Sequence, residues 1–164
     1  MEQTESLRDD YPEFNWVPPE NFHISLYHMD EIKDDKVPLV VEHVQNALYD
    51  IEQTHAFSLG ADLTIDKTIV LYISFRRNKT LEVIYSRIKE LFEDKSTKSF
   101  LPHMTIARYK IPSKQQYFHL KKKLYEMDVE LDFPINQIQL YQSISRPKNP
   151  IYNKVKSISL QEKA

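Results

Sequence analysis

The 164-residue sequence contains no cysteine, which excludes a disulfide framework and thiolate chemistry and favours an intracellular, cytoplasmic protein. It has a single glycine, so neither the P-loop nor the dinucleotide-binding fingerprint is present. No apolar run is long enough to span a membrane, and the N-terminus lacks the pattern of a signal peptide. The formal net charge of -2 argues against a strongly basic nucleic-acid platform, although a small local basic cluster is compatible with it.

The length and composition indicate one globular domain. Hydrophobic residues make up 41% and charged residues 28% of the chain, which is ordinary for a soluble protein. A chain of this length can build one core and is too short for two. Residues 1–15 are acidic, polar and aperiodic, so we interpret them as a loose arm or a short irregular helix before a domain over residues 16–164.

Two short apolar stretches each place a histidine two positions before a hydroxyl residue. The pairs are His23 with Ser25 and His103 with Thr105. Side chains alternate between the two faces of a strand, so each histidine would share a face with its hydroxyl residue while apolar neighbours face the core. We therefore predict a first motif strand over about residues 22–28 and a second one around His103.

The rest of the chain predicts helices and hairpins between and after these two strands. Apolar residues at helical spacing predict helices, and β-branched runs bounded by turn formers predict strands. The other expected elements are a helix over 38–53, a hairpin of 57–64 and 68–75, a helix over 81–92, a helix capped by Ser113, and strands over 135–143 and 153–160. This order favours a duplicated α+β domain whose two motif strands meet in one cleft across a pseudo-twofold axis.

Two histidines and two hydroxyls can carry out acid-base chemistry without a metal or a cofactor. A neutral imidazole can accept a proton from water, and a protonated one can donate a proton to a leaving oxygen; each step is worth on the order of 10²–10⁴ in rate. The hydroxyls of Ser25 and Thr105 can donate hydrogen bonds to the anionic oxygens of a substrate. A phosphodiester suits such a site, because both its attacking and its leaving atoms are oxygens.

Other interpretations of the two motifs are weaker. A histidine near a hydroxyl residue is usually a surface or packed histidine, but two copies in similar contexts favour function. A zinc site would need further ligands at usable spacing, which neither motif provides. A serine nucleophile would need a nucleophile elbow and a spaced acid, and both are missing.

The residues around both motifs resemble the 2H phosphoesterases, in particular the branch called RNA 2′,3′-cyclic phosphodiesterase or 2′-5′ RNA ligase-like. The resemblance covers about residues 14–160, including the approach to His23, the run 100–108, and the closing hairpin with Tyr152. It implies a bilobal fold of two pseudo-symmetric lobes, with antiparallel sheets, outer helices and a central cleft. It also implies metal-independent, cofactor-free hydrolysis of phosphodiesters, with His23 and His103 as the catalytic pair.

The sequence departs from the family at two places. Relatives usually have a strand and a helix before the first motif, for which residues 1–15 look too short and too polar. Position 25 is serine where many relatives have threonine, which keeps the hydroxyl donor but loses the methyl group that stiffens the side chain. We expect activity to survive the second change.

Three further residues are candidates for substrate contacts. The resemblance implies that Arg108 binds phosphate, although a straight strand would turn it away from His103 and only a bend or bulge after Thr105 would bring it back. By strand alternation, Tyr27 would lie on the same face as His23, and Tyr109 on the same face as His103. Both tyrosines are therefore candidates for base stacking.

The exact substrate stays open at this stage. The expected ligand is RNA, an oligonucleotide or a cyclic nucleotide, with no membrane partner. A nuclease for cyclic oligonucleotide signals and a non-catalytic nucleotide-binding scaffold are the alternatives. Intact histidines in both motifs favour an enzyme, since a pure binding module would not need two imidazoles.

Overall fold

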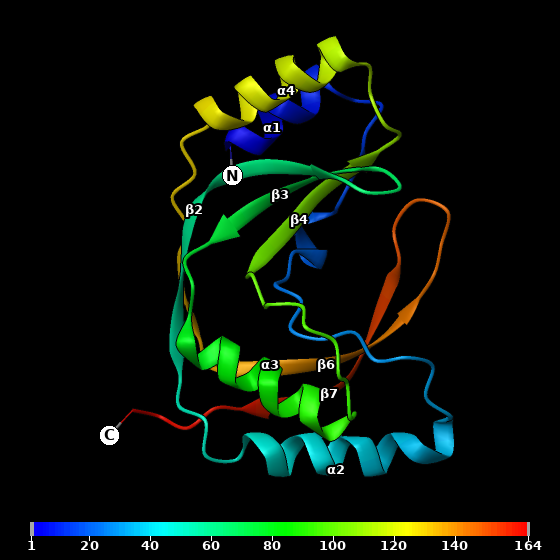
Figure 1. Cartoon of the computed structure of the whole chain (residues 1–164), viewed down its shortest axis with the longest axis vertical. Helices are drawn as coiled ribbons and strands as arrows, with labels where there is room; N and C mark the ends of the chain where they lie inside the picture. Colours follow the sequence, from blue (N-terminus) through cyan, green and yellow to red (C-terminus); the bar gives the residue numbers. More distant parts are fainter. Residues whose placement is uncertain (1, 164) are drawn as a thin grey trace.

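A computed structural model describes residues 2–163 and shows two helix-covered halves (Figure 1). Helices α1 (Glu2–Asp10) and α4 (Lys114–Glu126) cover one end of the molecule, and α2 (Val37–Leu48) and α3 (Lys79–Leu91) lie at the other. The larger sheet has the order β1-β4-β3-β2-β5, and a two-stranded sheet is formed by β6 and β7.

All strand pairs of the two sheets are antiparallel. The strands are β1 (Asn15–Trp16), β2 (Thr54–Ile65), β3 (Ile69–Phe75), β4 (His103–Tyr109), β5 (Asp132–Ile135), β6 (Gln137–Ile144) and β7 (Ile151–Ser159). The α+β class predicted from the sequence is confirmed. No helix within residues 2–163 has the length and apolar character needed to cross a bilayer.

Each half has its own hydrophobic core. In the first half, alternate residues of β3 such as Leu71 and Ile73 are fully buried beneath Leu120 and Leu124 of α4. In the second half, apolar residues of α2, α3 and β7 form a separate cluster. Burying one such leucine or isoleucine contributes about 1.5–3 kcal/mol, so these two clusters hold the sheets and helices together.

Several predicted elements are confirmed with small changes in their bounds. Strands β2 and β3 form the expected hairpin, and β6 and β7 form the closing one. Ser113 caps α4 with a full capping box, in which its hydroxyl accepts from the Gln116 amide and the Gln116 side chain accepts from the Ser113 amide. Helix α2 ends at Leu48, before the predicted end at residue 53.

Two parts of the chain differ from the expectations. The predicted strand over 22–28 is wrong, because these residues have no regular secondary structure and residues 23–32 make no backbone–backbone hydrogen bonds within the described chain. The N-terminal segment forms the regular helix α1 followed by β1, with Leu7 and Phe14 in the first core. Distant partners hold it there, including Lys123 of α4, which donates to Asp10 at 2.6 Å.

An ion pair joins the two helices of the second half. The Arg87 guanidinium of α3 donates to both carboxylate oxygens of Asp50 and, at 2.9 Å, to the Ala47 carbonyl at the end of α2. The Arg87 hydrogen bond lowers the pKa of Asp50 below its usual value. The pair therefore stabilises the fold above the ordinary aspartate pKa, and this contribution is lost as the pH falls through the lowered pKa of the folded state.

We expect Asp50→Asn to lower the thermal unfolding temperature at pH 7, with the difference from wild type shrinking as the pH falls toward about 3. Asparagine resembles the protonated carboxyl, so the unfolding temperatures of the two proteins should converge when Asp50 loses its charge. Thermal melts at a series of pH values would test this, with Asp66→Asn on the β2–β3 turn as the control. A constant difference across the whole series would contradict it.

Candidate active site

Strand β4 carries the second motif between two neighbouring strands. It pairs with β3 along its length and with β1 at its far end. His103 is exposed and Thr105 half-buried, whereas Met104 and Ile106 are buried in the first core. The alternation predicted for this motif is confirmed.

A β-bulge at Ile106 determines where Arg108 lies. Tyr72 pairs with Thr105 and Leu71 with Ala107, so Ile106 is an extra residue on β4. Two consecutive residues, Ile106 and Ala107, are therefore fully buried, and the alternation shifts by one. Arg108 is exposed as a result, on the face of β4 that carries Thr105.

The first motif lies on an irregular segment that passes from one core to the other. Phe22 and Ile24 pack against the first cluster, and Leu26 and Met29 pack against the second. His23 is exposed on this segment. Side-chain burial in the two cores therefore holds the first motif in place, whereas strand pairing holds the second motif.

Both motif histidines have the same hydrogen bond. His23 Nδ1 lies 2.7 Å from the Asn21 carbonyl oxygen, and His103 Nδ1 lies 2.9 Å from the Leu101 carbonyl oxygen. A carbonyl oxygen can only accept, so Nδ1 carries the proton in both rings. In the neutral rings, Nε2 is left as the basic atom that can exchange a proton with a ligand.

Each histidine also has a tyrosine against its ring. Tyr152 of β7 meets His23 edge-on, with ring centroids 5.1 Å apart, and Tyr72 of β3 meets His103 edge-on at 5.7 Å. Burial is the largest cause that raises the pKa of Tyr72, so this phenol stays protonated at neutral pH. Sequence reasoning missed Tyr72, although its place in the alternation of β3 could have indicated that it is next to the motif.

The hydroxyls of the two motifs are free. Among the residues that the structure describes, neither Ser25 Oγ nor Thr105 Oγ1 has a hydrogen-bond partner. Both side chains are half-buried rather than fully solvated. A ligand can therefore use both hydroxyls without breaking a contact within the protein.

The two tyrosines expected to stack on a base are already packed against the protein. The Tyr27 ring stacks on Phe92 at 5.6 Å, and its hydroxyl donates to Asp94 at 3.3 Å. The Tyr109 ring stacks on Phe14 at 4.7 Å. Burial first, and then the Asp94 carboxylate, raise the pKa of Tyr27. These contacts argue against a base-stacking role for either ring.

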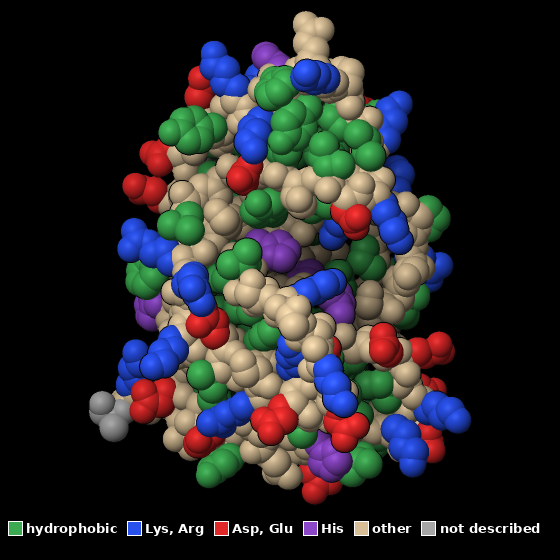
Figure 2. Space-filling model, viewed as in Figure 1, with side chains coloured by type: hydrophobic (Ala, Val, Ile, Leu, Met, Phe, Trp, Pro, Cys, Tyr) green, Lys and Arg blue, Asp and Glu red, His purple; other side chains and the backbone are tan. Residues whose placement is uncertain are grey.

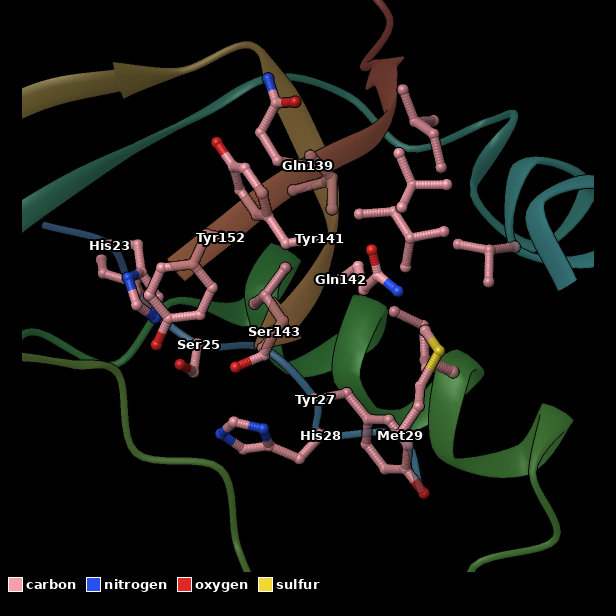
Figure 3. A pocket seen from close by; sticks show the side chains of 18 of the residues that line it. His23, Ser25, Tyr27, His28, Met29, Gln139, Tyr141, Gln142, Ser143 and Tyr152 are labelled. Atoms are coloured by element: carbon pink, nitrogen blue, oxygen red, sulfur yellow. The ribbon is translucent and has the colours of Figure 1, made fainter. Parts of the chain in front are cut away.

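An open cavity of about 1250 Å³ borders the first motif. Its lining includes His23, Ser25 and residues of the β6–β7 hairpin, and Figure 3 shows Tyr152 beside His23 with Ser143 nearby. His28 is exposed and lines the same cavity. Histidine side chains gather around the hollow in the middle of the face shown in Figure 2.

No three histidine, aspartate or glutamate side chains within the described part of the chain are grouped so that they could hold a metal ion. The pairing of each motif histidine with a backbone carbonyl occupies one of its two ring nitrogens. The chemistry that this arrangement can perform is proton transfer at two Nε2 atoms beside two hydroxyl donors.

An α+β fold with two such histidine–hydroxyl motifs is typical of the 2H phosphoesterases, and comparison with known proteins agrees. The chain belongs to the 2′-5′ RNA ligase superfamily, whose family model matches residues 2–146. The resemblance noted from the motifs is thereby confirmed.

The chain is also similar to curated RNA 2′,3′-cyclic phosphodiesterases, and its fold is similar to that of solved structures. An RNA 2′,3′-cyclic phosphodiesterase of Archaeoglobus fulgidus is 26% identical over 140 residues, covering 83% of this chain and 78% of the relative. One from Thermotoga maritima is 28% identical over 159 residues, covering 84% and 74%. A solved Thermus thermophilus protein matches with a TM-score of 0.70 at 20% identity, covering 98% of this chain and 94% of that one. Escherichia coli LigT complexed with 3′-AMP matches with a TM-score of 0.67 at 16% identity, covering 97% of this chain and 90% of that one.

We expect both His23 and His103 to populate the Nδ1–H tautomer when neutral, because each Nδ1 donates to a carbonyl oxygen. Long-range ¹H–¹⁵N NMR spectra above the pH of imidazole titration would report the tautomer directly. His43, exposed on α2, is the internal control and should show the Nε2–H form that free histidine prefers. Nε2–H signals for both motif histidines would overturn the assignment of Nε2 as the reactive atom.

Proposed function

We propose that this protein is a metal-independent phosphodiesterase that hydrolyses 2′,3′-cyclic phosphates or 2′-5′ linkages in RNA or oligonucleotides, with His23 and His103 as the acid-base pair. The observation that carries the proposal is the matched hydrogen bond from each Nδ1 to the carbonyl two residues earlier. It leaves two Nε2 atoms, one from each motif, for proton transfer on one substrate. An intracellular location, expected from the cysteine-free sequence, is part of the same proposal.

In the proposed hydrolysis, one imidazole accepts a proton from water through Nε2 as the water oxygen bonds to phosphorus. The other, protonated, imidazole donates its Nε2 proton to the ribose oxygen as the phosphorus–oxygen bond breaks. Water thus supplies the new hydroxyl of the phosphate, and the ribose regains its own hydroxyl. The two histidines can exchange these roles in the reverse direction or with another substrate.

The free hydroxyls and the arginine would bind the phosphate. Ser25 and Thr105 can each donate a hydrogen bond to a non-bridging oxygen, one from each motif. Arg108, turned out of the core by the bulge at Ile106, supplies a positive charge on the same strand as Thr105. Together they would stabilise the negative charge that increases on the phosphoryl oxygens in the transition state.

The names of the relatives support the RNA 2′,3′-cyclic substrate in particular. Assays of 2′,3′-cyclic, 2′-5′ and cyclic oligonucleotide substrates in EDTA would test the proposal. We expect turnover of the 2′,3′-cyclic or 2′-5′ substrates, with a bell-shaped pH profile because one ring must be neutral and the other protonated. Binding of a nucleoside 3′-monophosphate with no turnover of any substrate would instead indicate a scaffold.

His23→Ala and His103→Ala should each reduce turnover by about 10²-fold or more, because each removes one proton-transfer group. His43→Ala is the matched control and should keep wild-type activity, since His43 is exposed on α2 and is not among the residues that line the cavity. Circular dichroism and thermal melts would establish that the variants fold. Wild-type turnover by the double variant His23→Ala/His103→Ala would refute the site assignment.

Ser25→Ala and Thr105→Val should slow turnover by about 10²-fold, the usual effect of losing one hydrogen-bond donor to the transition state. Thr64→Val, an exposed threonine of β2, is the control and should have no effect. We expect no covalent intermediate, because each hydroxyl binds phosphate and does not attack it. Phosphorylated Ser25 or Thr105 trapped during turnover would point instead to a two-step mechanism.

A further inference from the structure

Two tyrosines of the β6–β7 hairpin line the cavity beside the first motif. Tyr152 and Tyr141 both border it, and their rings meet edge-on with centroids 5.9 Å apart. Within the described residues, neither phenol hydroxyl has a hydrogen-bond partner. Tyr141 is 44% exposed, and Tyr152 is half-buried against His23. These rings therefore lie where a ligand held by His23 would meet them.

The hairpin register explains why these side chains lie together. Ser143 is directly opposite Tyr152 across the two strands, and Tyr141 is two residues before Ser143 on β6. All three side chains consequently share one face of the hairpin. Figure 3 shows this face turned toward His23, with Gln139 farther along β6.

Farther along β6, the polar Gln139 lines the cavity together with the apolar Ile138 and Leu140. The Ser157 hydroxyl donates to the Gln139 side-chain oxygen at 2.7 Å, which leaves the Gln139 amide group able to donate to a ligand. Aromatic rings next to hydrogen-bonding amides suit a heteroaromatic base, whose faces stack and whose edge carries acceptors.

We propose that Tyr141 and Tyr152 form the surface that binds the nucleobase of the substrate, next to His23. This inference rests on the proposed function, since the base is the one attached to the ribose whose phosphate lies between the two histidines. It replaces Tyr27 and Tyr109, whose rings are packed on Phe92 and Phe14.

A pair of substrates that differ only in the base tests this. One is adenosine 2′,3′-cyclic phosphate, and the other is methyl riboside 2,3-cyclic phosphate, which has the same reacting atoms and no base. Tyr141→Ala and Tyr152→Leu should lower kcat/KM for the nucleotide by about 5- to 150-fold, mainly through KM, because one base–aromatic stack is lost. The base-free substrate should change by less than about 3-fold.

The controls separate stacking from support of the fold. Tyr152→Phe keeps the ring and should keep the preference for the nucleotide over the base-free substrate. Tyr125→Ala removes a tyrosine that is 88% exposed on α4 and should change activity on neither substrate. Equal losses on both substrates in Tyr141→Ala and Tyr152→Leu would overturn the inference and make these rings a support for His23. Equal kcat/KM of the wild type on the two substrates would also overturn it.

Calorimetry with adenosine 3′-monophosphate and ribose 3-phosphate separates this inference from the proposed function. If the wild type cleaves neither substrate, the proposed function fails, but the base-binding surface is still tested by affinity. Tyr141→Ala and Tyr152→Leu should then weaken binding of the nucleotide alone, by about 5- to 150-fold. Unchanged nucleotide affinity in both variants, or absence of any preference for the nucleotide in the wild type, would overturn the inference.

Discussion

The candidate site depends on how one irregular segment is held between two hydrophobic cores. Residues 23–32 make no backbone–backbone hydrogen bonds within the described chain, so side chains alone fix their position. Ile24 packs into the first core, and Leu26 and Met29 pack into the second. The position of His23 relative to His103 is therefore set by the packing of both halves around this segment, and a shift of either half would change that position.

The two histidines have similar surroundings even though their backbones differ. His103 lies on a strand paired on both sides, whereas His23 lies on a segment with no strand partner. Each ring nonetheless donates from Nδ1 to the carbonyl two residues earlier and meets a tyrosine edge. The acceptor is part of the local chain, so the motif itself orients the imidazole, and this orientation does not require a sheet.

The sequence predicted elements whose stability is local and missed those that depend on distant partners. Helices α2 and α3 have strong apolar periodicity, α4 begins at a capping box, and the β2–β3 hairpin has a polar turn between two apolar strands. Over residues 22–26 the alternation was correct about which side chains pack into a core, but it fails at Tyr27, which is packed, and at His28, which is exposed. Alternation also says nothing about whether a neighbouring strand is present. Helix α1 has little apolar periodicity, and Leu7 is buried in a cluster whose other members, including residues of α4 and β4, come mostly from far along the chain.

The bulge at Ile106 links two of the site assignments. By shifting the alternation, it exposes Arg108 and turns Tyr109 into the core, where its ring stacks on Phe14. A strand that supplies the cation in this way cannot also offer Tyr109 to a base. In the sequence, the adjacent apolar residues Ile106 and Ala107 are the sign of a bulge, but they do not show which of the two is the extra residue. Under the proposed function, an aromatic surface for a base would therefore come from elsewhere, and Tyr152 of β7 lies against the other histidine.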